Sequence, residues 1–188
     1  MELYLVRHTA PDIAAGICYG QSDVDVAQSF STELEQVRNK LAHVATARIY
    51  SSPLQRCSKL AAALGLGEVK HDVRLKELDF GDWELKRWDD IPRGLVDVWA
   101  EDHVMQAPPK GESFHALYLR AKHFLQEVSA DQSGQTVLVF THAGVIRALL
   151  SEALNLQLTD TFRLQIDYSG VTQLTIYNGV MRVAYVNR

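Results

Sequence analysis

The chain has 188 residues, of which 47% are apolar and 22% are charged, and its formal net charge is −4. This length and composition predict a single domain over residues 1–188 whose core needs no disulfide or metal for support. The charge gives no general attraction for nucleic acid or an anionic membrane, so neither is an expected partner, and an anionic ligand must be held by local cations. With two cysteines and no visible signal peptide or membrane span, we expect a cytoplasmic protein.

Two strands and two helices are predicted in the first half of the chain. Leu3–Val6 is a short apolar run that ends abruptly at charged residues, as a buried parallel strand does. Apolar residues at three- and four-residue spacing predict an amphipathic helix over Ser31–Ala45. Arg48–Tyr50 is a second strand, and the sequence Ser-Ser-Pro then caps a helix within Ser51–Leu64.

The strand-then-helix order returns near the end of the chain, with a strand at Thr136–Thr141 and a helix through Val145–Leu150. Val171–Tyr177 and Val180–Val186 alternate with the two-residue period of a strand, and the Asn178-Gly179 pair between them is typical of a type I′ hairpin. Together these elements predict an α/β protein: a three-layer α/β/α sandwich with a mostly parallel sheet and a C-terminal antiparallel hairpin.

Residues suited to phosphate chemistry follow two of the predicted strands. Arg7 and His8 end the first strand, and His142 ends the strand over Thr136–Thr141. Ligands of an open parallel sheet bind beyond the carboxyl ends of its strands, so we expect these side chains to converge. An imidazole attacks phosphorus directly, and guanidiniums hold phosphate oxygens in a forked geometry. Arg56, near the start of a predicted helix, is the expected second arginine ligand because free amides there favour anions.

A general acid is expected in the acidic and aromatic segment Lys76–Glu84. The apolar neighbours of Glu77 favour a desolvated carboxyl, which suits a proton donor. Asp79, Asp82 and Glu84 compete for that role, and each of the four is also explained as a solvated loop carboxylate.

Taken singly, these residues have ordinary structural explanations. A lone histidine after a strand is more often structural than catalytic, and Arg7 and Arg56 are also explained as surface or helix-end residues. Two histidines with nearby carboxylates also suit a divalent ion, but no H-x-H, H-E-x-x-H or C-x-x-C spacing occurs, so no metal is expected. The remaining histidines adjoin no strand-end motif and are expected to be structural: His43, His71, His103, His115 and His123.

Four motifs in chain order resemble the histidine phosphatase superfamily, also called the phosphoglycerate mutase-like family. They are LVRHT at Leu5–Thr9, SSPLQRC at Ser51–Cys57, ELDFGDWE at Glu77–Glu84 and THAGVIR at Thr141–Arg147. Each is weak alone, whereas the ordered set spans nearly the whole chain and is strong. Within the superfamily, GICYGQSD at Gly16–Asp23 is similar to the α-ribazole phosphatases of cobalamin assembly.

The resemblance implies a role for each motif. It makes His8 the phosphorylated nucleophile and Glu77 the group that protonates the leaving oxygen and then activates water. It implies a small-molecule phosphomonoester as substrate, α-ribazole 5′-phosphate in particular, and neither metal nor cofactor. The expected phosphate and substrate ligands are Arg7, Arg56, His142, Thr9, Tyr19, Gly20 and Ala143.

Two departures from the family pattern bear on the site. Many members carry Gly after the histidine and then a Ser or Thr and an Asn that contact phosphate, where this chain has Thr9, Pro11 and Ala14. We expect Thr9 to supply the missing contact. Related sequences often have Gly after Trp-Glu, where this chain has Leu85, which is expected to alter the loop near Glu77.

Three alternatives to an α-ribazole phosphatase remain open. A broad-specificity small-molecule acid phosphatase shares most of the same residues. A phosphoglycerate mutase must close its pocket for retransfer, which usually needs longer insertions than this chain offers, so hydrolysis is favoured. A non-catalytic phospho-ligand module would keep the pocket without turnover.

The leaving group is expected to be selected by two loops, at 18–23 and 87–111. The second loop is also expected to cover the site.

Overall fold

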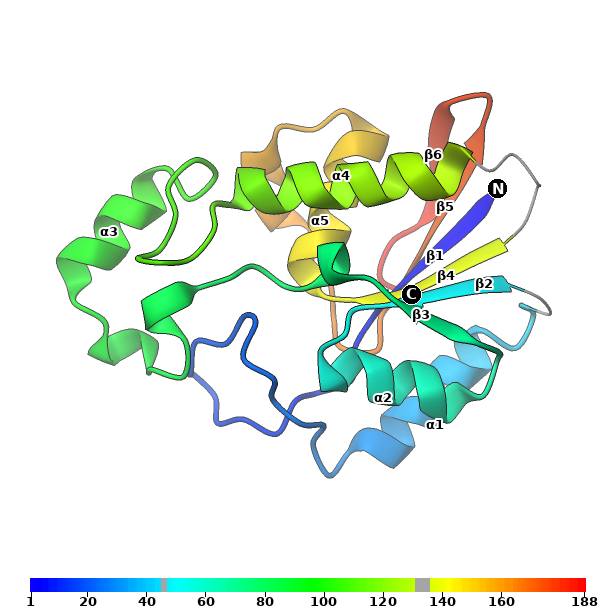
Figure 1. Cartoon of the computed structure of the whole chain (residues 1–188), viewed down its shortest axis with the longest axis horizontal. Helices are drawn as coiled ribbons and strands as arrows, with labels where there is room; N and C mark the ends of the chain where they lie inside the picture. The colour runs from blue at the N-terminus through cyan, green and yellow to red at the C-terminus, as the bar shows by residue number, and fades with distance from the viewer. Residues whose placement is uncertain (45–46, 131–135) are drawn as a thin grey trace.

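A six-stranded sheet in the order β3-β2-β4-β1-β5-β6 forms the centre of the computed structural model, which describes residues 1–44, 47–130 and 136–188 (Figure 1). Its parallel strands are β1 (Glu2–Arg7), β2 (Ala47–Ser51), β3 (Val69–His71) and β4 (Thr136–Thr141). The antiparallel strands β5 (Val171–Tyr177) and β6 (Val180–Tyr185) complete one edge. The predicted α/β sandwich with its C-terminal hairpin is therefore confirmed.

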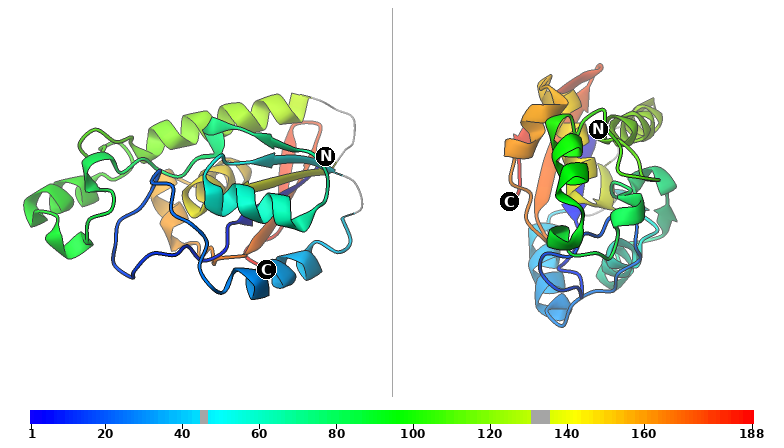
Figure 2. Two further views of the ribbon diagram at one scale, coloured as in Figure 1. Left: turned by 60° about the horizontal axis from the view of Figure 1, so that its bottom comes forward. Right: turned by 90° about the vertical axis from the view of Figure 1, so that its left-hand side faces the viewer.

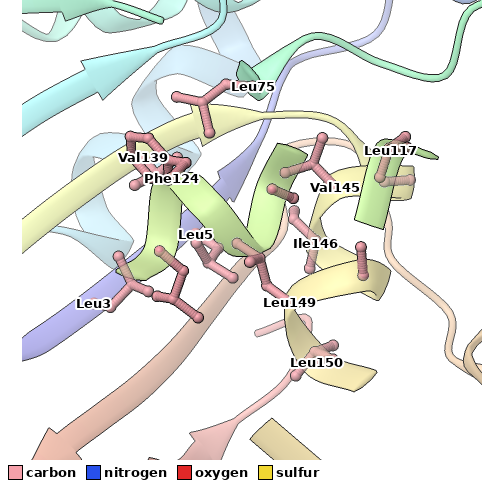
Figure 3. Packing of buried hydrophobic residues seen from close by; sticks show 14 of the residues in the cluster. Leu3, Leu5, Leu75, Leu117, Phe124, Val139, Val145, Ile146, Leu149 and Leu150 are labelled. Atoms are coloured by element: carbon pink, nitrogen blue, oxygen red, sulfur yellow. The ribbon is translucent and has the colours of Figure 1, made fainter. Parts of the chain in front are cut away.

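Helices cover both faces of this sheet. The pair α1 (Phe30–Lys40) and α2 (Gln55–Leu64) lies on one face, and α4 (Phe114–Ala130) and α5 (Ala143–Leu154) lie on the other (Figure 1). Successive residues of β1 point to opposite faces of the sheet. Leu3 and Leu5 pack with α4 and α5 (Figure 3). Tyr4 and Val6 pack with α1 and α2. Burial on both faces explains why β1 is a continuous apolar run.

Most predicted elements are confirmed, with differences at the helices. The helix predicted over Ser31–Ala45 ends at Lys40, and Ala45 lies outside the described residues. The second helix begins at Gln55 without a side-chain cap, since Ser51 belongs to β2 and the hydroxyl of Ser52 faces His142 at 2.9 Å. At the hairpin, Asn178 and Gly179 have φ angles of 49° and 76°, as a type I′ turn requires.

Three neighbouring parallel strands end at the same level of the sheet. Arg7 of β1 pairs in register with Thr141 of β4, and Ser51 of β2 pairs with Phe140. The residues that follow, among them His8, His142 and Ser52, therefore leave the sheet side by side at its carboxyl edge.

An arm projects beyond this edge of the sheet and carries α3 (Arg93–Glu101), none of whose residues is buried (Figure 2). The arm has its own small core, in which Trp83 and Ile91 pack with Cys18 and are flanked by Trp88 and Trp99. Its packing thus ties the segment after Glu77 to the loop at 16–22. That 87–111 covers bound substrate stays a prediction.

None of the helices in the described ranges combines the length and apolar character that crossing a membrane requires.

Candidate active site

His8 and His142 lie together at the carboxyl edge, with ring centroids 5.0 Å apart and both side chains buried. Nδ1 of His8 is 2.7 Å from the carbonyl oxygen of Thr9. A carbonyl only accepts hydrogen bonds, so this contact places the ring proton on Nδ1 and leaves a lone pair on Nε2. His8 therefore has the tautomer that a nucleophilic imidazole needs.

The surroundings keep both imidazoles neutral. Burial, followed by the charges of Arg56 and Arg7, holds the pKa of His8 well below its usual value. Burial also lowers the pKa of His142 well below its usual value, with the charge of Arg56 as the next cause. The cluster therefore combines the positive charges of two arginines with two neutral imidazoles.

The two expected arginine ligands converge on this pair of histidines from different elements. Arg7, at the end of β1, donates from Nη1 to the carbonyl of Ile166 at 2.5 Å. The fully buried Arg56, in the first turn of α2, donates to the carbonyls of Gly20 and Ser22 at 2.6 and 2.9 Å. Each guanidinium is thereby fixed in place.

Some buried donors of this pocket have no partner within the described part of the chain. They are Nε of Arg7, Nε of Arg56 and the hydroxyl of Thr9. Buried polar atoms normally have a hydrogen-bond partner, and these three fit an anionic ligand with several oxygens. Pro11, which is buried and pairs with Val26, and Ala14, which is exposed, have hydrocarbon side chains and therefore offer no donor.

Glu77 lies against the N-terminal end of α5. Its Oε2 accepts from the backbone amide of Gly144 at 3.2 Å, and its Oε1 accepts from the amide of Leu78 at 2.9 Å. A Cβ on Gly144 would lie 2.2 Å from Oε1, so a glycine is needed for this approach. The carboxyl is therefore held at the start of α5, against a residue that follows His142 by two positions in the chain.

The competing carboxylates of this segment have other partners. Asp79 accepts from the amide of Gly81 at 2.8 Å, and Asp82 pairs with Lys110 at 3.0 Å. Glu84 accepts from the amides of Gln21 and Phe80 at 2.7 and 3.1 Å. Burial raises the pKa of Glu84, but these hydrogen bonds and those from Ser22 outweigh it and lower the pKa. Each of the three shapes a loop, which leaves Glu77 as the candidate acid.

Tyr19 and Gly20, which are expected to bind substrate, lie beside Arg56. The carbonyl of Gly20 anchors Arg56, and the Tyr19 ring lies 5.3 Å from the Arg56 guanidinium carbon. Burial and a hydrogen bond to the Tyr168 hydroxyl, at 2.7 Å, raise the pKa of Tyr19. Ala143 is the first residue of α5, so its amide lies at a helix N-terminus beside His142.

Two residues of the site were not expected from the sequence. Ser52 reaches Nε2 of His142 with its hydroxyl at 2.9 Å, although Ser-Ser-Pro looks like a helix cap in sequence. Tyr168 lies under Arg7, with the guanidinium carbon 3.8 Å from the ring centre, and its ring is 5.5 Å from that of His8. Tyr168 has no sequence signal, since it comes from a loop between Arg163 and β5.

The five remaining histidines lie away from this cluster. His43 contacts the Tyr4 hydroxyl at 3.1 Å, and His103 packs against Trp99 and Phe162. Within residues 1–44, 47–130 and 136–188, no group of three or more His, Cys, Asp or Glu side chains is placed to hold a metal ion.

Comparison with known proteins identifies relatives over the whole chain. Residues 3–188 match the model of the histidine phosphatase superfamily (branch 1). The chain is 24% identical over 194 residues to an adenosylcobalamin/alpha-ribazole phosphatase of Salmonella typhimurium, covering 100% of this chain and 96% of the relative. It is 29% identical over 167 residues to phosphoserine phosphatase 1 of Hydrogenobacter thermophilus, covering 85% of this chain and 79% of the relative.

A solved structure agrees with these matches. A mycobacterial glucosyl-3-phosphoglycerate phosphatase in complex with VO3 superposes with a TM-score of 0.87 at 27% identity, covering 99% of this chain and 98% of the other. The family match extends over all four motifs, from the strand that ends at His8 to the helix that follows His142. The chain therefore belongs to the histidine phosphatase superfamily.

Proposed function

We propose that this protein hydrolyses phosphomonoesters through a phosphohistidine intermediate on His8. The observation that carries the proposal is a buried cluster in which the rings of His8 and His142 lie 5.0 Å apart and the charges of Arg56 and Arg7 act on His8. A neutral imidazole held among fixed cations suits attack on a phosphate that those cations bind.

In the first step, Nε2 of His8 forms a bond to phosphorus as the bond to the ester oxygen breaks. Glu77, in its protonated form, donates a proton to that leaving oxygen, which departs as an alcohol. In the second step, water attacks the phosphorus as Glu77 removes its proton, and the bond between phosphorus and Nε2 breaks. Orthophosphate leaves and the starting state is restored, with no metal or cofactor required.

Electrostatic stabilisation supplies most of the rate in this scheme. Arg7, Arg56, His142 and the hydroxyl of Thr9 surround the three spare phosphoryl oxygens, over which the transition-state charge is spread. Carbonyls already fix both arginines before substrate arrives, so little reorganisation is needed during the reaction. The amide of Ala143 adds a donor from the start of α5.

For the substrate we propose α-ribazole 5′-phosphate. The support is the GICYGQSD segment at Gly16–Asp23 and the full-length relative that is named for this activity. Phosphoserine is the second candidate, because a phosphoserine phosphatase is 29% identical to this chain. Tyr19 and Gly20 lie in the loop that would contact the leaving group in either case.

The test is a phosphatase panel with α-ribazole 5′-phosphate, phosphoserine, 3-phosphoglycerate and p-nitrophenyl phosphate, run with and without chelator. We expect phosphate release with the highest kcat/KM for α-ribazole 5′-phosphate, unchanged by chelator and abolished in H8A. A higher kcat/KM for phosphoserine would favour the second candidate. Isomerised product from 3-phosphoglycerate would indicate a mutase, and vanadate binding without any hydrolysis would indicate a binding module.

A further inference from the structure

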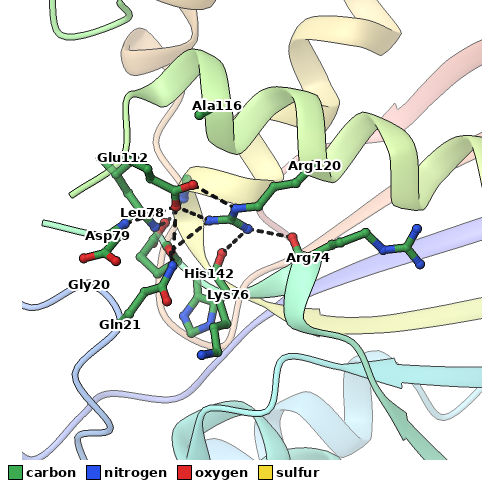
Figure 4. A network of polar contacts seen from close by, with 12 residues as sticks. Gly20, Gln21, Arg74, Lys76, Leu78, Asp79, Glu112, Ala116, Arg120 and His142 are labelled. Atoms are coloured by element: carbon green, nitrogen blue, oxygen red, sulfur yellow. Dashed lines mark hydrogen bonds and ion pairs between the residues drawn. The ribbon is translucent and has the colours of Figure 1, made fainter. Parts of the chain in front are cut away.

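Arg120 lies on α4, outside the four family motifs, yet its side chain contacts the segment that carries Glu77. Its Nη1 donates to the carbonyls of Arg74 and Lys76 at 2.6 and 2.7 Å, and its Nη2 donates to the carbonyl of Glu77 at 2.9 Å (Figure 4). The main chain on the N-terminal side of the proposed acid is thus held by one guanidinium.

The same guanidinium forms a two-point ion pair with Glu112. Nε donates to one carboxylate oxygen at 3.1 Å and Nη2 donates to the other at 2.5 Å. Glu112 in turn accepts from the amide of Asp79 at 3.1 Å, which fixes the chain on the C-terminal side of Glu77. All five N–H groups of Arg120 therefore have acceptors, and the pair is mostly buried, with each side chain 19% exposed.

Gln21 joins this network to the phosphate pocket. Its side-chain amide donates to the carbonyl of Glu77 at 3.2 Å and lies 3.5 Å from Glu112. Its neighbours Gly20 and Ser22 accept the hydrogen bonds of Arg56. The chain segments that bear the acid and the phosphate ligand are therefore fixed relative to each other.

We propose that Arg120, paired with Glu112, is a positioning residue that holds Glu77 where it protonates the leaving oxygen. This proposal rests on the proposed acid role of Glu77. Within the described residues Arg120 makes no hydrogen bond to His8 or to the phosphate ligands, and it acts on His142 only through its charge. Its loss should weaken proton donation while leaving the binding of phosphate intact.

Proton donation is tested by the dependence of kcat/KM on the leaving group. Good leaving groups such as p-nitrophenol need little protonation, whereas alkoxides need it fully. We would compare p-nitrophenyl, phenyl and ethyl phosphate in wild type, E77Q and R120M. Small displacements of a catalytic group cost on the order of 10²-fold, so R120M should lose about that factor with ethyl phosphate and far less with p-nitrophenyl phosphate.

Arg74 offers the matched control. It is also a half-buried arginine of this segment, paired with Asp72 at 2.6 Å and Glu127 at 2.7 Å, but its side chain does not contact the Glu77 backbone. R74M should keep the wild-type leaving-group dependence. If R120M folds poorly because Glu112 is left unpaired, R120M/E112L removes both charges and tests the same prediction.

The outcomes separate this proposal from the proposed function. A steeper leaving-group dependence in E77Q and R120M, with an unchanged Kd for orthophosphate and a wild-type profile in R74M, supports the positioning role. Steepening in E77Q without steepening in R120M and R120M/E112L overturns it. A wild-type profile in E77Q itself removes the acid role of Glu77 and this proposal with it.

Discussion

The backbone amide of Gly144 donates to the Glu77 carboxylate at 3.2 Å, and the close approach of the two residues depends on the missing side chain of Gly144. Gly144 is the second residue of α5, where alanine is the better helix former by about 1 kcal/mol. Alanine at position 144 would therefore favour the helix, whereas the contact with Glu77 requires glycine.

G144A should lower activity without unfolding the protein. The added Cβ would lie 2.2 Å from Oε1, and the flexible Glu77 side chain is the group that moves. We expect kcat/KM for ethyl phosphate to fall on the order of 10²-fold, in line with the cost of misplacing a catalytic group. Steady-state kinetics and a thermal melt check the two parts.

G94A provides the control for this substitution. Gly94 is the second residue of α3, and a Cβ there meets nothing within 4 Å. We expect unchanged kcat/KM and a stability gain of about 0.5–1 kcal/mol. Wild-type activity in G144A would contradict an acid role for the Glu77 carboxyl at its position beside Gly144.

Leu85 is held in a left-handed conformation, with φ of 62°, although its side chain is 62% exposed. It occupies the position at which the family pattern favours glycine. A left-handed conformation costs a non-glycine residue roughly 1–2 kcal/mol, and the exposed side chain loses little packing when removed. L85G should therefore raise the free energy of unfolding by about 1 kcal/mol in urea melts. A loss of stability would contradict this strain.

Stability should fall as the pH is lowered through the range where unfolded histidine becomes charged. The pKa values of His8 and His142 lie well below 6.5 in the folded protein, so the unfolded state binds more protons from about pH 6.5 downwards. Each histidine should contribute up to about 1.4 kcal/mol per pH unit to this loss. Urea melts between pH 7 and 5 measure the slope, which should be shallower in H8N. An equal slope in H8N would show that His8 is not buried neutral.

Tyr168 should increase the affinity for orthophosphate through its ring rather than its hydroxyl. The Arg7 guanidinium carbon lies 3.8 Å from the ring centre, and such contacts contribute roughly 0.5–2 kcal/mol. Y168A should raise the Kd for orthophosphate several-fold, whereas Y168F, which loses only the bond to Tyr19, should stay near wild type. Isothermal titration calorimetry distinguishes the two, and equal values in both variants would contradict a role for the ring.

The strands that carry the site residues were predictable because each is marked by a pattern of neighbouring residues in the sequence. Leu3–Val6 and Thr136–Thr141 are apolar runs that end at polar residues, a pattern that burial on both faces requires. α4 was not among the predicted elements, although Phe114, Leu117, Ala121 and Phe124 repeat at helical spacing and are buried.

Contacts between distant segments could not be predicted in the same way. Arg120 and Glu112 are ordinary charged residues in sequence. Arg120 donates to carbonyls more than 40 positions away, and Glu112 accepts from the amide of Asp79, 33 positions away. Ser52 was assigned to a helix cap because its partner, His142, is 90 positions distant. Sequence patterns reveal which strand a residue follows, but not which side chain faces it across the sheet edge.

The most direct test of the account is to trap the phosphorylated enzyme. The protein is mixed with ³²P-labelled substrate, quenched within milliseconds in alkali, where phosphohistidine survives and phosphoserine esters do not, and digested for mass spectrometry. With p-nitrophenyl phosphate as the substrate, we predict label on His8 of the wild type and none in H8A. E77Q should carry more label, because p-nitrophenolate leaves without a proton whereas attack by water still needs Glu77. Label on another residue, or full turnover by H8A, would contradict the account.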